Sequence, residues 1–249
     1  MAATTKPQTR KRWYELGLGL RARLGVLYHL LRYSQGDEGQ RAYTYWLERR
    51  RKNRMQETMA EFDRILAGMT TDSIALDLGA HKGEYTEKLA KTGAQVHAFE
   101  PEPMLFAALQ ERFVDTPNVI LHQAAIAAEA GRMTLHVEMH EGAALPGMSN
   151  TLVEGHRNAG DGPSIEVECV DFFAFLESLG SVPALIKMDI EGAEVPILER
   201  LIEERRLDRV GMLFVETHER QVPPLRQRSI ALHKHLSKAQ PANVNLLWP

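Results

Sequence analysis

The sequence is poor in the features that mark disulfide-bonded, secreted and membrane-spanning proteins. Cys169 is its only cysteine, which excludes an internal disulfide and a zinc site built from cysteines. It has no run of 18 or more uncharged apolar residues, and its first residues lack the basic, apolar and small-residue order of a signal peptide. We therefore expect a soluble protein that stays in the cytoplasm.

The rest of the composition is that of an ordinary globular protein. The 249 residues are 44% hydrophobic and 25% charged, which excludes a disordered, collagen-like or coiled-coil chain. The chain contains no internal repeat and no low-complexity segment. Its length suits one large domain, or one domain with an accessory segment.

The formal net charge of −3 hides two regions of opposite charge. Residues 1–54 contain 13 Lys and Arg against 4 Asp and Glu, whereas the other 195 residues contain 17 against 29. Aromatic residues are interleaved with the basic ones, namely Trp13, Tyr14, Tyr28, Tyr33, Tyr43, Tyr45 and Trp46. This mixture suits contact with a nucleic acid, an anionic lipid or an acidic glycan. The alternative is a solvated helical extension whose aromatic side chains pack on the main domain.

Two helical patterns precede a region of different character. Leucines recur at roughly helical spacing over residues 16–31, and a second helical pattern covers 40–67, with Gly68 as its stop signal. From Ser73 onward, short apolar runs alternate with amphipathic segments of helix length, which is typical of βα units. We therefore predict a basic helical N-terminal extension over residues 1–70 and an α/β domain over 71–249.

The βα units predict a mostly parallel central sheet. We expect its strands at 74–78, 95–99, 119–121, 185–188, 212–215 and 243–248, and helices at 84–91, 103–113, 170–179, 193–204 and 227–238. Two more β-like runs, at 132–138 and 165–169, are separated by a Gly-rich stretch at 141–162. That stretch is too long for a plain turn, which indicates an active-site lid or a substrate loop.

The most informative motif follows the first expected strand. Asp77 ends the strand, and Gly79 and Gly83 allow a tight turn and the close approach of a ligand before a helix begins. Their spacing differs from the glycine motifs that bind nucleotide and dinucleotide phosphates, and an acid at the strand end favours a cationic group. Glu100 ends the next strand, 21 positions after Gly79, where an acid can accept both hydroxyls of a ribose. The alternative is that the glycines serve only strand-to-helix packing.

A second group of polar residues follows two later strands. Asp189, Glu191 and Glu194 lie between one strand and the start of a helix, and Glu216 and His218 follow the next strand. Carboxylates near a helix N-terminus are favourable without any catalytic role, and this explanation fits Glu194 best. Ligands of open α/β sheets bind at the carboxyl ends of the strands, so we expect the other four residues to converge on one rim.

Together these motifs identify a resemblance. They read Asp77-Leu78-Gly79-Ala80-His81-Lys82-Gly83-Glu84-Tyr85-Thr86, Phe99-Glu100-Pro101, Lys187-Met188-Asp189-Ile190-Glu191-Gly192-Ala193-Glu194 and Val215-Glu216-Thr217-His218. Ser149-Asn150-Thr151-Leu152 and Val170-Asp171-Phe172-Phe173 add to them. From about residue 70 to 220 the chain resembles the FkbM family of S-adenosylmethionine-dependent methyltransferases. Two departures are His81, where the family usually has Asn, and a short carboxyl end.

The resemblance implies a Rossmann-like class I methyltransferase that uses S-adenosylmethionine to methylate a hydroxyl of a small molecule or glycan. It assigns cofactor binding to Asp77, Gly79, Ala80, Gly83, Glu100, Pro101 and Asp189. The catalytic residues are then His218, Glu191 and Glu216, with His218 as the leading base because its ordinary pKa of about 6.5 is nearest to working pH. Glu191 would orient the acceptor hydroxyl or the imidazole.

Three alternatives stay open at this point. The same acids and imidazole could hold a hard divalent cation, although our first assignment contains no metal. The acceptor could be a nucleic acid docked by the basic segment, but Asp189-Ile190-Glu191-Gly192 occupies the place where such enzymes often have an Asn/Asp-Pro-Pro-Tyr block. The chain could also be a non-catalytic binding module with a methyltransferase-like fold.

Overall fold

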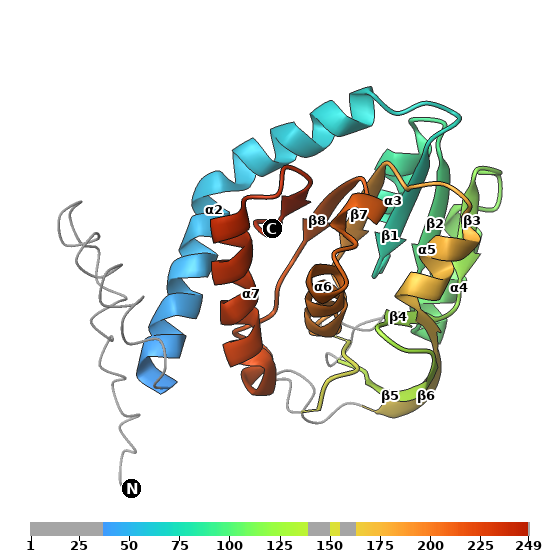
Figure 1. Ribbon diagram of the computed structural model, residues 1–249. Helices are drawn as coiled ribbons and strands as arrows, with labels where there is room; N and C mark the ends of the chain where they lie inside the picture. Colours follow the sequence, from blue (N-terminus) through green and yellow to red (C-terminus); the bar gives the residue numbers. More distant parts are fainter. Residues whose placement is uncertain (1–36, 139–149, 155–162, 249) are drawn as a thin grey trace, which may run out of the picture.

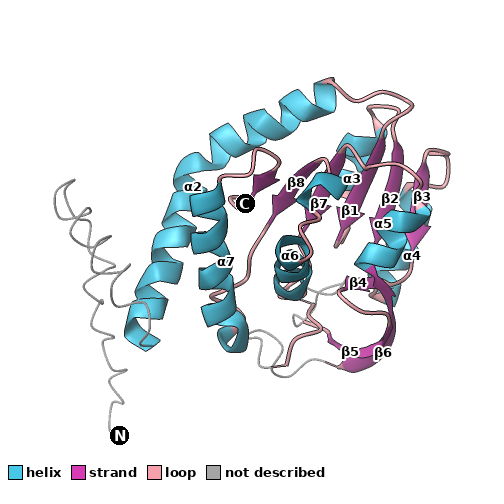
Figure 2. Cartoon of the chain, in the orientation of Figure 1, coloured by secondary structure: helices cyan, strands magenta, loops and turns pink. Residues whose placement is uncertain are grey.

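A six-stranded sheet forms the centre of the molecule (Figures 1 and 2). The computed structural model describes residues 37–138, 150–154 and 163–248. The helix expected at 16–31 and most of the Gly-rich stretch at 141–162 lie outside the described residues. The strand order is β3-β2-β1-β7-β8-β9 and every neighbouring pair is parallel, which confirms the predicted Rossmann-like α/β fold.

The strands of this sheet are short apolar runs. Their bounds are β1 (Ile74–Leu78), β2 (Gln95–Phe99), β3 (Val119–His122), β7 (Leu185–Met188), β8 (Met212–Val215) and β9 (Val244–Asn245). All of β7 and β8 is buried, as strands covered on both faces require. The first five agree with the sequence prediction to within one residue. The last is shorter than predicted, because Asn245 is the final residue that pairs with β8.

Helices cover both faces of the sheet. They are α2 (Asp37–Ala67), α3 (Glu84–Ala90), α4 (Pro103–Arg112), α5 (Phe172–Ser178), α6 (Glu194–Glu203) and α7 (Arg226–Ala239), with short 3₁₀ turns at Leu207–Arg209 and Pro223–Leu225. Helices α5, α6 and α7 pack on one face, in a core that includes Leu76 and Ile186. Helices α2, α3 and α4 pack on the other face, against neighbouring strand residues such as Ala75 and Ala98.

A small second sheet lies beside the carboxyl ends of the central strands. It consists of β4 (Ala125–Ala127), β5 (Gly131–His136) and β6 (Ser164–Asp171), in the order β4-β6-β5. The two β-like runs of the sequence correspond to β5 and β6, which pair antiparallel. The sequence analysis missed β4, because three small or apolar residues give no alternation.

The long helix α2 is part of the packed domain. Its Phe62 is fully buried and contacts Phe214 and Trp248, with ring centroids 5.3 and 4.8 Å apart. Its first half packs against α7 through Tyr43 and Leu47. The predicted boundary near residue 70 falls between α2 and β1, and the described part of the N-terminal segment completes the core.

No described helix combines the length and the apolar character that crossing a membrane requires.

Candidate active site

The glycine loop after β1 is held by the backbone of the neighbouring strand. The amides of Gly79 and Ala80 both donate to the carbonyl of Phe99, at 3.1 and 2.9 Å, and Gly83 donates to the carbonyl of Ala80 at 2.7 Å. Gly79 and Gly83 have φ of 81° and 79°, in the left-handed region that favours glycine. The predicted tight turn is therefore present, and the parallel β1–β2 pair determines its position.

The close approach of β7 is a second reason why position 79 requires glycine, and the sequence analysis did not identify it. A Cβ atom at this position would lie 1.9 Å from the backbone oxygen of Asp189. Any side chain at Gly79 would push the end of β7 away from the end of β1. A substitution here therefore disturbs the two strand ends as well as the ligand approach that we predicted.

Glu100 is buried at the end of β2 and faces the glycine loop. One carboxylate oxygen accepts from the amide of His81 at 2.8 Å, and the other accepts from the amide of Glu102 at 3.0 Å. Burial raises the pKa of Glu100 to about 7, although these two amides favour the ionised form. Each oxygen has a second lone pair, so the carboxylate can still accept from two further donors.

A cavity of about 200 Å³ opens between the glycine loop and the carboxyl ends of the strands. Five of the seven predicted cofactor residues line it: Gly79, Ala80, Glu100, Pro101 and Asp189. Apolar side chains, among them Leu105 and Ile126, form another part of its wall. Asp77 and Gly83 are not among the lining residues: Asp77 is buried at the end of β1, and Gly83 closes the turn against α4.

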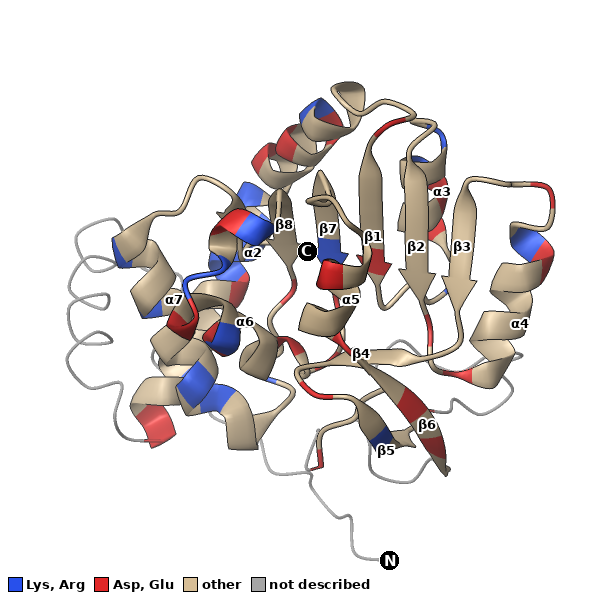
Figure 3. Ribbon diagram, turned by 45° about the vertical axis from the view of Figure 1, so that its right-hand side comes forward, with Lys and Arg blue, Asp and Glu red and all other residues tan. Residues whose placement is uncertain are grey.

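Asp77 is fully buried and acts within the protein. Its carboxylate accepts from the hydroxyl of Thr86 at 2.6 Å and lies 3.3 Å from the ammonium group of Lys187. Lys187 also donates to the carbonyl of Gly79 at 2.7 Å and lies 3.6 Å from the carboxylate of Asp189. Figure 3 shows this pairing as a basic position in β7 beside an acidic position in β1.

Lys187 holds the glycine loop and is a residue that sequence reasoning missed. Burial alone would lower the pKa of Lys187, but Asp77 and Asp189 raise that pKa above its ordinary value, so the ammonium group stays charged. The available signal was a single lysine inside the apolar strand β7. A buried lysine needs an acid beside it, and Asp77 occupies the paired position on β1.

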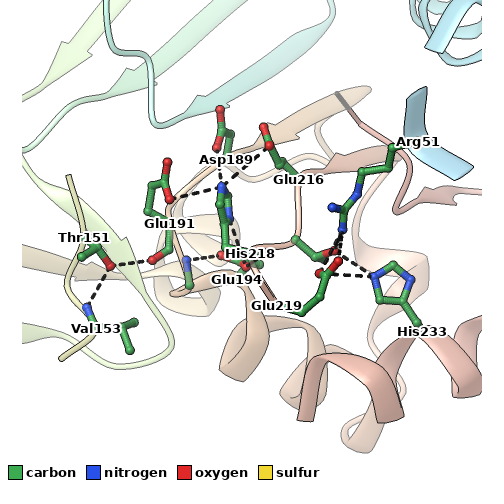
Figure 4. Close-up of polar contacts among 12 residues, drawn as sticks. Arg51, Thr151, Val153, Asp189, Glu191, Glu194, Glu216, His218, Glu219 and His233 are labelled. Atoms are coloured by element: carbon green, nitrogen blue, oxygen red, sulfur yellow. Dashed lines mark hydrogen bonds and ion pairs between the residues drawn. The ribbon is translucent and has the colours of Figure 1, made fainter. Parts of the chain in front are cut away.

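Four of the predicted residues do converge on one rim. Figure 4 shows the imidazole of His218 among the carboxylates that follow β7 and β8. Its Nε2 atom lies 3.4 Å from Asp189, 3.4 Å from Glu191 and 3.9 Å from Glu216. The side chain of His218 is only 3% exposed. Burial lowers the pKa of this imidazole, but Glu191 and Glu194 raise it, and the net result is well above the ordinary value.

Glu194 has a larger role than the helix-terminal one that we assigned to it. One carboxylate oxygen accepts from the amide of Gly192 at 2.7 Å. The other lies 3.1 Å from the amide and 3.3 Å from the Nδ1 atom of His218. Because Glu194 is fully buried, it fixes the imidazole ring and directs Nε2 toward the rim.

The described residues 150–154 form one side of this rim. Thr151 pairs with His136 on β5 and its hydroxyl donates to the carbonyl of Glu191 at 2.5 Å. Glu191 has φ of 51°, a conformation that non-glycine residues rarely adopt, and this hydrogen bond helps to hold it. Asn150 and Leu152 line the cavity. The segment that resembles the family's loop therefore contacts both the cavity and the rim.

A buried ion pair supports the rim from behind. Arg51 on α2 donates to the hydroxyl of Thr217. It also donates to both carboxylate oxygens of Glu219, which lie 2.9 Å away. His233 on α7 lies 2.8 Å from the same hydroxyl. Residues 216 and 218 face the rim while 217 and 219 face α2 and α7 (Figure 4). Arg51 therefore does not belong to the exposed basic run in which the sequence placed it.

Two kinds of ligand suit these side chains. The cavity can hold a nucleoside-containing molecule, because it joins an acid suited to a ribose with an apolar wall. The rim can hold a cation, because one ligand atom each from Asp189, Glu216 and His218 lie within 4.8 Å of one another.

Comparison with known proteins identifies the family. Residues 77–236 of the chain match the methyltransferase FkbM domain family. The chain belongs to this FkbM methyltransferase family. The match includes all ten residues that we predicted for the site.

Shorter similarities connect part of the chain to curated methyltransferases. The chain is 44% identical over 54 residues to ribosomal RNA small subunit methyltransferase A of Thermotoga petrophila, which is 22% of this chain and 21% of that protein. It is 46% identical over 55 residues to the protein of the same name from Thermotoga maritima, covering 22% and 20%. The chain thus matches about a fifth of the length of these relatives, and the similarity supports methyl transfer in general.

Proposed function

We propose that this FkbM methyltransferase transfers the methyl group of S-adenosylmethionine to a hydroxyl of a small molecule or glycan. The observation that carries the proposal is one cavity with two unlike ends. Glu100 follows β2 on one side of the glycine loop, and the carboxylates Asp189 and Glu191 follow β7 on its other side.

The cofactor fits this cavity in one orientation. The two oxygens of Glu100 would accept the ribose hydroxyls, and the apolar wall at Leu105 and Ile126 would contact the adenine ring. Asp189 would accept from the amino group of the methionine part. The sulfonium would then lie toward the rim, where an excess of carboxylates favours a positive charge.

The reaction requires alignment and the removal of one proton. The acceptor oxygen attacks the methyl carbon in line with the carbon–sulfur bond, which breaks to leave S-adenosylhomocysteine. Holding both partners in this geometry can supply as much as ~7–11 kcal/mol of the barrier reduction.

Glu191 is our choice for the residue that takes the acceptor proton. Its carboxylate lines the cavity, whereas His218 does not. Nδ1 of His218 is engaged by Glu194, and its Nε2 faces Asp189 and Glu191, so neither nitrogen is directed at an acceptor in the cavity. We therefore propose Glu191 as the base in place of His218, which the sequence analysis favoured, and we propose that the imidazole organises the rim.

Methylation of RNA is the second candidate. It is favoured by the names of the Thermotoga relatives, which are ribosomal RNA methyltransferases, and by the basic N-terminal segment, whose exposed Arg49 and Lys52 lie on α2. Against it, the similarity covers 22% of the chain. We therefore place RNA among the acceptors to be tested.

The test has two stages. Calorimetry with S-adenosylhomocysteine asks whether the cofactor binds, with Glu111→Gln as a control because Glu111 is exposed on α4 and does not line the cavity. Transfer of label from methyl-labelled S-adenosylmethionine is then screened against hydroxylated sugars, hydroxylated secondary metabolites and ribosomal RNA. Binding with transfer to a hydroxylated small molecule or glycan supports the proposal, transfer to RNA alone supports the second candidate, and no binding rejects both.

A further inference from the structure

The three rim residues that could hold a cation come from two adjacent strand ends. Asp189 follows β7 directly, and Glu216 and His218 follow β8. These strands pair in register, with Met188 opposite Val215, so the backbone fixes the separation of the side chains. The set therefore does not depend on a loop outside the described residues.

The distances within the set indicate a gap at its centre. Charge-assisted N–H···O bonds are typically about 2.7–2.9 Å long. Nε2 of His218 lies 3.4 Å from Asp189 and 3.9 Å from Glu216, so these ion pairs are longer than such bonds, and the three ligand atoms are spread around a common space. Carboxylate and imidazole ligands about 2.0–2.2 Å from a shared ion would span such a space.

The imidazole is already oriented as a ligand. Glu194 engages Nδ1 at 3.3 Å, and this carboxylate is itself fixed by the amide of Gly192. A carboxylate behind a histidine is the usual arrangement for orienting a metal-bound imidazole. Bulk water has little access to Nε2 as a hydrogen-bond partner, since the side chain of His218 is only 3% exposed.

Carboxylates outnumber the basic groups around this set, and the imidazole of His218, whose pKa they raise, balances only part of their charge. Four carboxylates surround one imidazole: Asp189, Glu191, Glu194 and Glu216. The nearest described lysine contact is Lys187, which is shared between Asp77 and Asp189. Buried charges are costly unless they are paired or coordinate a metal.

We propose that Asp189, Glu216 and His218 bind a divalent cation of the Mg²⁺ or Mn²⁺ class, with water completing its coordination, beside the cofactor cavity. Carboxylate oxygens suit these ions, and Mn²⁺ also accepts an imidazole nitrogen. The role of the ion rests on the proposed function: it holds the acceptor oxygen and weakens the O–H bond while Glu191 takes the proton.

Mn²⁺ binding tests the site without any acceptor. Free Mn²⁺ is measured by electron paramagnetic resonance during titration of the full-length protein, with S-adenosylhomocysteine present and absent. We expect one bound ion in the wild type and in the control Glu111→Gln. Glu216→Gln and His218→Gln should each weaken binding at least tenfold, and Glu194→Gln about 10–100-fold. Thermal unfolding and S-adenosylhomocysteine affinity show which variants are folded.

The outcomes separate the cation site from the methyl transfer. Binding that is absent in the wild type up to millimolar Mn²⁺, or equal in Glu216→Gln and the wild type, overturns the site. Methyl transfer that continues at an unchanged rate in excess chelator also overturns it, while the proposed function stands. Specific Mn²⁺ binding without transfer to any acceptor supports the site and rejects the proposed function.

Discussion

The two ends of the cavity are built in different ways. At the cofactor end, backbone amides hold the loop, and both oxygens of Glu100 accept hydrogen bonds at 2.8 and 3.0 Å. At the rim, side chains of like charge surround His218 at 3.4 to 3.9 Å. The first end is complete before any ligand arrives. The second is a group of carboxylates around one imidazole, where we propose that a cation binds, and this difference would separate recognition of the cofactor from activation of the acceptor.

The largest effect that we expect concerns the rim alone. Glu191→Gln should lower kcat by about 10²–10⁴-fold, because it removes the proposed proton acceptor. The affinity for S-adenosylhomocysteine should stay within about twofold, because the ribose and adenine contacts lie at the other end. Turnover is measured with an acceptor from the screen, and the exposed Glu111→Gln is the matched control. Near-normal turnover in Glu191→Gln together with loss in His218→Ala would return the base to His218.

The second largest effect concerns the support behind the rim. Arg51→Met leaves the buried carboxylate of Glu219 unpaired, which should lower the free energy of unfolding by about 3–5 kcal/mol. Arg49→Met removes the same charge from an exposed position of the same helix and should change it by no more than about 0.5 kcal/mol. Denaturant titration measures both. Equal effects would show that the pair between α2 and the β8 loop contributes nothing.

The positions of both groups of site residues could be predicted from the sequence. The cofactor end follows from local motifs, which place the strand ends, Gly79 and Glu100. The convergence of Asp189, Glu191, Glu216 and His218 also followed, because parallel strands bring their carboxyl ends to one edge.

The contacts that support these residues could not be predicted. Lys187 meets Asp77 because β1 and β7 are neighbours, although they lie far apart in the chain. Arg51 appeared to belong to a solvated basic run, and only the packing of α2 against α7 shows that it is buried. Long-range pairing of this kind leaves no periodic signal in a single sequence.

A third variant addresses the cofactor end. Glu100→Ala removes both proposed ribose contacts and should weaken S-adenosylhomocysteine binding by at least about 10–100-fold, since one hydrogen bond to a charged group alone contributes about 1.5–3 kcal/mol. Calorimetry measures the affinity, and Mn²⁺ binding at the rim should be unchanged. Retained affinity in a folded Glu100→Ala protein would place the ribose elsewhere.

The pH dependence of the same interaction should be smaller. The free protein has a pKa of about 7 at Glu100, and the ribose contacts favour the ionised form. Affinity for S-adenosylhomocysteine should therefore fall as the pH drops below about 7, by at most about tenfold per pH unit. The free energy of unfolding of the free protein should instead rise as the pH drops from about 7 towards 4.5. The reason is that the folded state, in which the pKa of Glu100 is raised from the ordinary 4.5, binds the proton more readily than the unfolded state. Glu100→Ala should remove both slopes, and an unchanged affinity slope in this variant would assign it to another group.

The smallest effects should come from the exposed face of α2, which lies outside the matched family domain. Arg49 and Lys52 are exposed there, and Arg50 lies over the ring of Trp46 at 5.5 Å. We expect Arg49→Ala and Lys52→Ala each to weaken binding to phosphatidylserine vesicles roughly fivefold at low salt, from about 1 kcal/mol per basic residue. The difference should vanish at 1 M salt, where the Debye length is about 3 Å. Deleting residues 1–54 would not test this, because it also removes the buried Arg51. Equal vesicle binding by the wild type and both variants at low salt would leave this face as a solvated part of the fold and confine ligand binding to the strand ends.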